Sequence, residues 1–260
     1  MKVSLIITTY NWVSALSAVL DSVKKQSILP GEVIIADDGS NDLTKKLIDD
    51  EIDNFPVPLI HSWQKDDGFR AAESRNNAVS KSNHDYLIMI DGDIILHEKF
   101  IESHIRNAKR GFFVQGGRAM MNEKLSNRVL SSGYVPNFFS PGLKNRKNTI
   151  NSIILSRVFS KIQNSINKTR SCNFACWKSD YILINGFDND FVGWGREDSE
   201  FVQRLLNSNL QRIYLKFSGI CFHIYHNENS RVNLQKNDDI LNNTITSRRT
   251  TCNNGYSKFL

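Results

Sequence analysis

Cysteine is scarce in this chain of 260 residues. Cys172, Cys176, Cys221 and Cys252 form no C-x-x-C pair. Four cysteines in a chain of this length are too few for a disulfide scaffold, and their spacing does not match the usual zinc sites. We therefore expect reduced thiols, as in a cytoplasmic protein.

Long apolar runs are also missing. No stretch of 18 apolar residues occurs, so we expect no membrane-spanning helix. Near the N-terminus Lys2 precedes a short apolar run, but the polar residues 8–11 interrupt it after Ile7. The run is too short for the apolar core of a signal peptide, so a cytoplasmic location is expected.

Two phosphate-binding motifs are absent as well. No G-x-G-x-x-G follows the first apolar run, and no G-x-x-x-x-G-K-[ST] occurs, so dinucleotide and P-loop folds lose their main support. The net charge of +6 favours an anionic partner, such as a nucleotide, a nucleic acid or a membrane surface. Basic and aromatic residues do not interleave as they do in RNA-binding modules, so we expect no nucleic-acid partner.

Apolar runs alternate with helical patterns in the first half of the chain. The runs at residues 3–9, 32–38, 57–63 and 85–91 predict strands. Residues 16–23 and 71–82 predict helices, and Ser40 is a candidate N-cap for another, with Leu43, Leu47 and Ile48 on its inner face. Nearly continuous apolar strands between helices indicate an α/β fold with a parallel sheet covered on both faces.

Polar and acidic residues follow these predicted strands. The first strand ends in Thr8, Tyr10 and Asn11, the second in Asp37 and Asp38, and the fourth in Asp91, Gly92 and Asp93. Ligands of such sheets lie beyond the carboxyl ends of the strands, so these groups should meet at one edge.

The acidic groups each have two interpretations. Asp91 and Asp93, with a glycine between them, suit a divalent cation with oxygen ligands, or a tight turn with two solvated carboxylates. Asp37 and Asp38 suit hydrogen bonds to a base or ribose, or a turn. Lys65, Arg70 and Arg75 lie between the third and fourth strands and could approach a diphosphate, although each alone is typical of a surface charge.

Four segments together resemble the family 2 glycosyltransferases: SLIITTYNW, EVIIADDGSND, DDGFRAAESRNNAV and LIMIDGDIIL, within about the first 120 residues. The resemblance implies the GT-A fold, a Rossmann-like α/β fold for nucleotide-diphospho-sugars. It further implies Mn²⁺ or Mg²⁺ held by Asp93 and Asp91, with Thr8, Tyr10 and Asp38 facing the nucleoside of a UDP-sugar. The donor site is expected to include Thr8, Tyr10, Asn11, Asp37, Asp38, Lys65, Arg70, Arg75, Asp91 and Gly92.

The segment CNFACWKSDYILINGFDNDFVGWGREDSEF resembles the acceptor region of galactosyltransferase-type C-terminal domains and of bacterial chondroitin-type polymerases. The resemblance implies that Trp194 stacks on the acceptor sugar, and that Gly193 and Gly195 allow its close approach. Glu197 would bind acceptor hydroxyls, and Asp198 would remove a proton. From the residues alone, REDSEF would be the start of a helix.

A late metal ligand is also implied by resemblance. CFHIYHNEN supplies His223 and His226, and we favour His226 because Asn227-Glu228-Asn229 resembles the residues after the metal histidine in galactosyltransferases.

The remaining segments are less specific. In residues 155–168 an apolar face (Leu155, Val158, Phe159, Ile162, Ile166) lies opposite a basic one (Arg157, Lys161, Asn164, Lys168). This predicts a basic amphipathic helix, which either rests on anionic lipid or packs on the protein body. We expect a single domain at residues 1–230, with a nucleotide-sugar half at 1–120, an acceptor half at 170–230 and a loosely ordered tail at 231–260.

The predicted activity is an inverting, metal-dependent transfer of a sugar from a UDP-sugar to a glycan or lipid-linked saccharide in bacterial surface polysaccharide or lipopolysaccharide assembly. The protein would be cytoplasmic, with peripheral contact at the inner membrane surface. The alternatives are a sugar nucleotidyltransferase, which should carry a glycine-rich phosphate loop, and a non-catalytic nucleotide-binding or nucleic-acid-binding protein.

Overall fold

The central strands bury side chains on both faces. In β1 (Ser4–Thr9), Leu5 and Ile7 share an apolar cluster with α1 (Val13–Lys24). Ile6 points to a second cluster that includes α3 (Ala71–Ser80). A strand buried on both faces needs a nearly continuous apolar run, and residues 3–7 provide one. The sheet is therefore covered by helices on both sides.

The computed structural model describes residues 1–227 and 232–260, and within them the main sheet has eight strands in the order β3-β2-β1-β4-β10-β6-β11-β9. Their bounds are β2 (Glu32–Asp37), β3 (Leu59–Trp63), β4 (Tyr86–Asp91), β6 (Phe112–Gly116), β9 (Lys161–Ile162), β10 (Phe174–Trp177) and β11 (Gln211–Leu215). Strands β1 to β4 are parallel, β10 runs antiparallel to β4 and β6, and β11 is parallel to β6. The predicted α/β fold with a mostly parallel sheet is confirmed.

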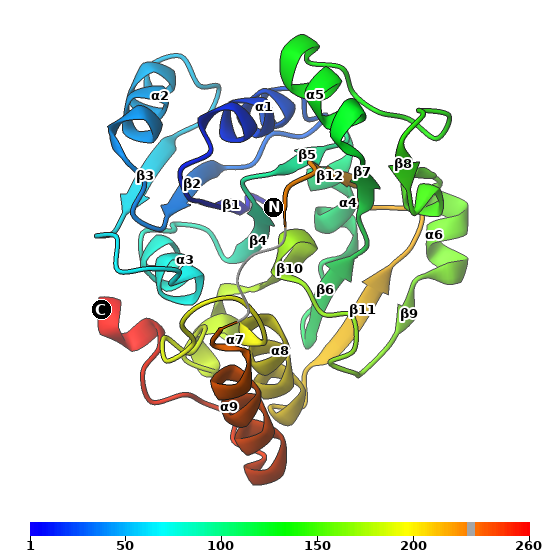
Figure 1. Ribbon diagram of the computed structural model, residues 1–260. Coiled ribbons are helices and arrows are strands. Elements are labelled where there is room, and N and C mark those ends of the chain that lie inside the picture. Colours follow the sequence, from blue (N-terminus) through cyan, green and yellow to red (C-terminus); the bar gives the residue numbers. More distant parts are fainter. Residues whose placement is uncertain (228–231) are drawn as a thin grey trace.

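A smaller sheet, ordered β5-β12-β7-β8, packs beside the first. It comprises β5 (Ile94–Leu96), β7 (Ala119–Met121), β8 (Leu143–Lys144) and β12 (Cys221–His223). The other helices are α2 (Asp42–Ile52), α4 (Phe100–Asn107), α5 (Glu123–Ser132), α6 (Ile153–Phe159), α7 (Lys178–Leu183), α8 (Glu197–Asn207), α9 (Leu234–Ser247), and the 3-10 helices η1 (Arg146–Thr149), η2 (Ser171–Asn173) and η3 (Tyr256–Phe259). Figure 1 shows α1, α2 and α5 on one side of the main sheet, with α3, α7, α8 and α9 on the other.

Neither the cysteines nor the helices indicate a cross-linked or membrane-spanning chain. All four cysteines are buried and free. Among residues 1–227 and 232–260, no helix combines the length and apolar character needed to cross a bilayer.

The start of α2 differs from the prediction. Its N-cap is Asn41, whose side chain accepts a hydrogen bond from the Leu43 amide, whereas the Ser40 hydroxyl accepts one from the Asn11 amide. The buried residues of the helix are Thr44 and Ile48, whereas Leu43, expected on the inner face, is 65% exposed. Ser40 instead ties the loop after β1 to the loop after β2.

The predicted basic helix at residues 155–168 is wrong in extent. Helix α6 ends at Phe159, and Lys161–Ile162 then pair antiparallel with β11, with Ile162 opposite Ile213. An open sheet edge offers backbone hydrogen bonds that an isolated helix end cannot match. Lys168 adopts a left-handed conformation with φ of 61°, which does not continue a helix.

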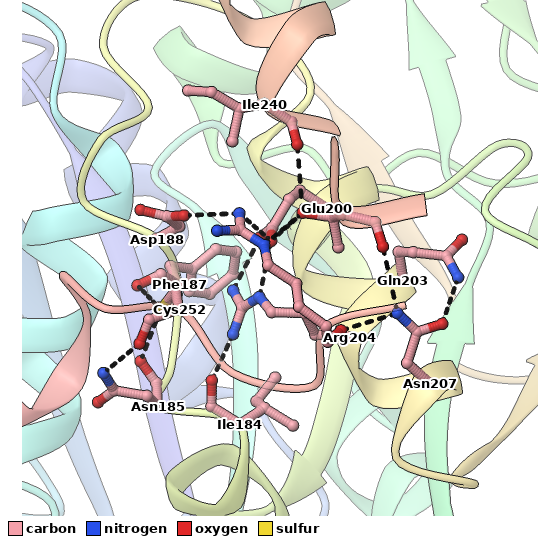
Figure 2. A network of polar contacts seen from close by, with 12 residues as sticks. Ile184, Asn185, Phe187, Asp188, Glu200, Gln203, Arg204, Asn207, Ile240 and Cys252 are labelled. Carbon is pink, nitrogen blue, oxygen red and sulfur yellow. Dashed lines mark hydrogen bonds and ion pairs between the residues drawn. The ribbon is translucent and has the colours of Figure 1, made fainter. Parts of the chain in front are cut away.

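The expectation of a loosely ordered C-terminus is also wrong. Helix α9 packs on α8, and η3 packs on α3, with Cys252 and Tyr256 buried. Polar contacts fix this segment: Arg249 donates to Asp188 and Glu200, both at 2.9 Å, and the Thr244 hydroxyl donates to Glu200 at 2.9 Å. Arg204 binds both Glu200 oxygens at 2.8 Å. Figure 2 shows Asp188, Glu200 and Arg204 within this network.

Substituting Arg249 tests how strongly this network holds the C-terminal segment. Arg249→Ala leaves Asp188, which is 3% exposed, without this charge partner. We expect a loss of about 2–3 kcal/mol in the free energy of unfolding, measured by urea denaturation at neutral pH. The adjacent, exposed Arg248 provides the control as Arg248→Gln, which should change stability by less than about 0.5 kcal/mol. Equal effects of the two variants would contradict a structural role for the network.

Candidate active site

The ends of the parallel strands bring the predicted donor residues to one edge of the sheet. In the register of the strands, Thr8 lies opposite Asp91 of β4, and Thr9 lies opposite Asp37 of β2. Gly92 closes the turn after β4 by donating its amide to the Thr8 carbonyl at 2.7 Å. A Cβ atom at Gly92 would lie 2.9 Å from that carbonyl oxygen, so the close approach of the two strand ends requires glycine.

The two aspartates after β2 have different surroundings. Asp37 is fully buried, and its oxygens bind the Ser40 amide and the His61 ring, both at 2.8 Å. Asp38 accepts from Gln64 at 2.7 Å and from the Arg70 amide at 2.8 Å. Burial raises the pKa of Asp38 to about 6. Asp37 therefore shapes the turn after β2. Asp38 is instead held by Gln64 and Arg70, which belong to the loop between β3 and α3.

The other predicted donor residues line the loops around Asp38. The Tyr10 hydroxyl donates to Asp66 at 3.0 Å, and Asn11 accepts from the Asn41 amide at 2.9 Å. The Arg70 guanidinium pairs with Asp67 at 2.5 Å, and Lys65 is exposed.

Arg75 links the two halves of the site. Its guanidinium donates to Thr8 Oγ1 at 3.1 Å and to Asp91 Oδ1 at 3.2 Å. Its Nη1 atom lies 3.8 Å from Glu197 Oε1 and 3.9 Å from Asp198 Oδ1. Nη1 is buried and makes no hydrogen bond within the described part of the chain. The sequence placed Arg75 near a diphosphate, whereas the structure surrounds it with three carboxylates.

A cluster of three potential metal ligands lies at the same edge. Asp93 Oδ2 is 3.3 Å from Nε2 of both His223 and His226, and one ligand atom from each residue lies within 4.8 Å of the others. The other Asp93 oxygen is buried and has no hydrogen-bond partner among residues 1–227 and 232–260. Burial lowers the pKa of His223 to about 4, which keeps this imidazole neutral as metal binding requires.

The cluster differs from the sequence expectation in two ways. Both histidines approach Asp93, so the geometry does not favour His226 over His223. Asp91 lies outside the cluster and is bound by Arg75 instead. Glu228 and Asn229, which motivated the preference for His226, lie outside the described residues.

The first turn of α8 carries Glu197 and Asp198. Arg196, immediately before the helix, has φ of 76°, and three acidic residues in the first turn complement the helix dipole. Asp198 Oδ2 accepts the Ser171 amide at 3.0 Å, while Asp198 Oδ1 and Glu197 Oε2 are buried without a hydrogen-bond partner in the described chain. Burial, followed by the charge of Asp198, raises the pKa of Glu197 to about 7.

The glycines beside Trp194 make room for the chain itself. A Cβ atom at Gly193 would lie 2.7 Å from the Asn233 side chain, and one at Gly195 would lie 3.1 Å from Leu234. Both glycines have positive φ angles, 77° and 106°. From the sequence, these glycines were expected to let a sugar come close. In the structure, they also leave room for the residues at the start of α9. Trp194 is 38% exposed.

Three residues near the site were missed in the sequence. Gln64 binds Asp38, and the Ser171 amide binds Asp198, but an amide side chain in a loop and a backbone donor carry no sequence signal. Arg118 donates to Cys172 Sγ at 3.3 Å, and Asp91 and Asp93 lie close enough for their charges to act on it. Its position after two glycines at the end of β6 could have indicated it.

Comparisons with known proteins identify the fold and the family. The fold is similar to that of S. aureus TarS residues 1–349, with a TM-score of 0.64 over 95% of this chain and 65% of that one, at 13% sequence identity. The protein thus has the fold of GT-A glycosyltransferases. Residues 4–170 match the family model described as glycosyl transferase family 2, and residues 154–227 match the one described as the N-terminal domain of galactosyltransferase. The chain belongs to glycosyltransferase family 2.

Individual relatives share shorter or weaker similarity. A validoxylamine A glucosyltransferase of Streptomyces hygroscopicus subsp. limoneus is 24% identical over 232 residues, which cover 78% of this chain and 47% of that protein. The O-antigen chain rhamnosyltransferase RfbN of Salmonella typhimurium is 41% identical over 97 residues, which cover 37% of this chain and 29% of RfbN. The chain spans about half the length of the validoxylamine glucosyltransferase.

The raised pKa of Glu197 predicts a pH-dependent cost to folding. Its pKa of about 7 in the folded protein exceeds its unfolded value of 4.5, so the folded state is penalised as pH rises from about 4.5 to 7. Glu197→Gln removes the ionisable group beside Asp198, Arg75 and Asp91. We compare the free energy of unfolding of the variant with that of the wild type. We expect this difference to shift in favour of the variant by about 2 kcal/mol from pH 5 to pH 8.

Urea denaturation of both proteins at the two pH values measures this gain. Subtracting the free energy of unfolding of the wild type from that of the variant at each pH removes the contributions of groups that titrate equally in both proteins. A stability difference that is the same at pH 5 and pH 8 would mean that Glu197 ionises as an ordinary glutamate.

Proposed function

We propose that the protein transfers a sugar from a UDP-sugar to a hydroxyl group of a glycan or lipid-linked saccharide, with inversion at the anomeric carbon. The observation that carries the proposal is the meeting, around Arg75, of Asp91 from the donor half with Glu197 and Asp198 from α8. Two of the carboxylates have buried oxygens with no hydrogen-bond partner in the described chain, as expected of groups arranged for a ligand.

The donor is proposed from the fold and from its solved relatives. TarS structures similar to this chain are complexes with UDP and with UDP-GlcNAc, with TM-scores of 0.61 and 0.56. In this chain the buried Asp38 and the adjacent Tyr10 lie beyond β2 and β1, where a nucleoside would bind. Lys65, Arg70 and Arg118 could approach the diphosphate charges.

The Asp93, His223 and His226 cluster fits a divalent cation. One carboxylate and two imidazoles suit Mn²⁺ and comparable ions, and the unpartnered Asp93 oxygen is a coordination position that the protein leaves unused. A cation held by these residues would supply positive charge for the leaving diphosphate. Asp91 has a different task, because its carboxylate holds the Arg75 guanidinium.

The acceptor side is proposed for the first turn of α8. The Ser171 amide fixes one oxygen of Asp198, which leaves Oδ1 to accept a proton from an acceptor hydroxyl. Trp194 is 38% exposed, and its indole ring is of the type on which a sugar stacks. The attacking hydroxyl then displaces UDP in one step, so no covalent sugar intermediate is needed.

The cellular role is proposed as surface polysaccharide assembly on the cytoplasmic side of the inner membrane. The similarity to the O-antigen chain rhamnosyltransferase RfbN supports this setting. The family membership favours UDP release over the pyrophosphate release of a nucleotidyltransferase and over binding without catalysis. Screening the purified protein for UDP release with different UDP-sugars and simple sugar acceptors tests the proposal. Failure to release UDP with any pair would contradict it.

Metal binding by the cluster can be measured without activity. Asp93→Asn should weaken Mn²⁺ binding by more than about tenfold, measured by the electron paramagnetic resonance of free Mn²⁺, because a neutral amide is a poor ligand for a divalent cation. Asp91→Asn is the matched control, since Asp91 lies outside the cluster, and it should largely retain binding. Equal loss in both variants would place Asp91 among the ligands, and unchanged binding in both would remove the cluster from metal binding.

The two carboxylates of α8 can be separated by kinetics. Asp198→Asn keeps the hydrogen bond to Ser171 but cannot take a proton, so we expect kcat to fall by about 10²–10⁴-fold with donor binding retained. Glu197→Gln should instead act mainly through a raised acceptor KM. A near-normal kcat in Asp198→Asn with a collapse in Glu197→Gln would exchange the two roles. If both variants remain active, the base lies elsewhere.

A further inference from the structure

Helix α6 exposes its apolar side chains and buries its serine. Ser156 is the buried residue of this helix, while Ile154 is 75% and Val158 is 63% exposed. Ile153 and Phe159 are also exposed. A helix that packs on a protein body normally has the opposite orientation. Exposed apolar groups of this density mark a surface that another apolar phase covers.

Neighbouring segments extend this apolar surface. The loop before β8 exposes Phe139, at 83%, and Phe138, and Ile162 of β9 is exposed. Figure 1 shows α6, β8 and β9 together along one edge of the molecule. The loop is held in place, because Arg146 donates to the Phe138 carbonyl at 2.6 Å. We call this surface the α6 surface: Phe138, Phe139, Ile153, Ile154, Val158, Phe159 and Ile162.

The charge of this part of the chain is of one sign. Residues 124–179 contain no Asp or Glu, and they contain ten Lys and Arg: Lys124, Arg128, Lys144, Arg146, Lys147, Arg157, Lys161, Lys168, Arg170 and Lys178. The whole chain has 33 Lys and Arg against 27 Asp and Glu, so the net charge of +6 comes from this stretch and the rest is net negative. Lys144, Lys147, Arg157 and Lys161 are exposed on the elements that carry or flank the α6 surface.

We propose that the α6 surface docks on an anionic lipid bilayer, with its apolar side chains in the interface and the flanking cations against lipid headgroups. Apolar groups surrounded by Lys and Arg match the boundary between acyl chains and anionic headgroups. A second copy of the chain fits poorly, because a two-fold contact through this surface would bring Arg157 and Lys161 toward the same cations of the partner. The purpose of docking, which is to bring the site to a lipid-linked acceptor, rests on the proposed function. The docking itself does not.

Vesicle binding tests the surface directly. The full chain is sedimented with vesicles of phosphatidylcholine alone or mixed with phosphatidylglycerol. We expect binding to the mixed vesicles only. Ile154→Ser with Val158→Ser should reduce the partition coefficient at least about tenfold, and Phe139→Ser provides an independent variant outside the helix. Arg157→Gln with Lys161→Gln should reduce it about fivefold for each cation.

Matched controls lie on α2 and α9, outside the α6 surface. Leu43→Ser removes an apolar residue that is as exposed as Val158, and Lys46→Gln with Lys236→Gln removes two exposed charges. Both controls should bind vesicles as the wild type does. Wild-type protein that fails to bind mixed vesicles, or variants of the α6 surface that bind unchanged, would overturn the proposal. So would self-association of the wild type in light scattering that the Ile154 and Val158 changes abolish.

The outcome is separable from the proposed activity. Substitutions on α6 lie outside the site residues, so UDP release with a soluble sugar acceptor should stay within about twofold of the wild type. Failure of the transferase proposal would appear as absent UDP release and would leave vesicle binding intact. Failure of the docking proposal would appear as absent vesicle binding and would leave UDP release intact.

Discussion

The buried guanidinium of Arg75 is the interaction on which the site depends. It binds Thr8 and Asp91 at the ends of β1 and β4, and it faces Glu197 and Asp198 at the start of α8. Three carboxylates face this one guanidinium in a poorly solvated place, so acidic groups outnumber the cation that binds them. The pKa of about 7 for Glu197 has the same origin, because burial and the charge of Asp198 outweigh the attraction of Arg75. Such a surplus favours the binding of a cation, and the Asp93 cluster lies at the same edge.

Helix α8 transmits the packing of the C-terminal segment to this site. Its first turn carries Glu197 and Asp198, and one turn later Glu200 binds Arg204 and Arg249. Because the helix is rigid over this distance, the network that fixes Glu200 also fixes the two carboxylates before it. The segment that supplies Arg249 lies beyond residue 227, where the matches to the family models end. C-terminal residues of this chain thus help to hold a part of the site, through Arg249 and Glu200.

The sequence predicted the parts of the site that depend on strand ends and local spacing. Thr8, Asp38 and Asp91 follow apolar runs, and parallel strands bring such positions together whatever the rest of the fold does. Contacts between distant segments were not predictable. The approach of Arg75 to Glu197 depends on how α8 crosses the sheet, which no local pattern encodes. The surroundings of Asp37 show the same limit, since its hydrogen-bond partner His61 comes from a neighbouring strand.

The spacing of apolar residues gave a wrong prediction where contacts between distant segments competed with helix formation. Residues 155–168 have helical spacing, but the free edge of β11 captures Lys161 and Ile162 and ends the helix at Phe159. Short helices gain most of their stability from packing, so pairing with an exposed strand edge outweighs propensity.

The acidic site and the basic surface lie on different parts of the molecule. The acidic site is formed by strand ends and α8, whereas the part of the acid-free stretch that contains α6 and β9 lies along one edge of the molecule (Figure 1). Charges on the surface act over about 8 Å at physiological salt, so the basic edge attracts an anionic bilayer without reaching far into solution. Once at the surface, the apolar side chains of α6 provide an attraction that salt does not screen. Charge then selects the membrane and the orientation of approach, and burial of Ile154 and Val158 decides how long the protein stays.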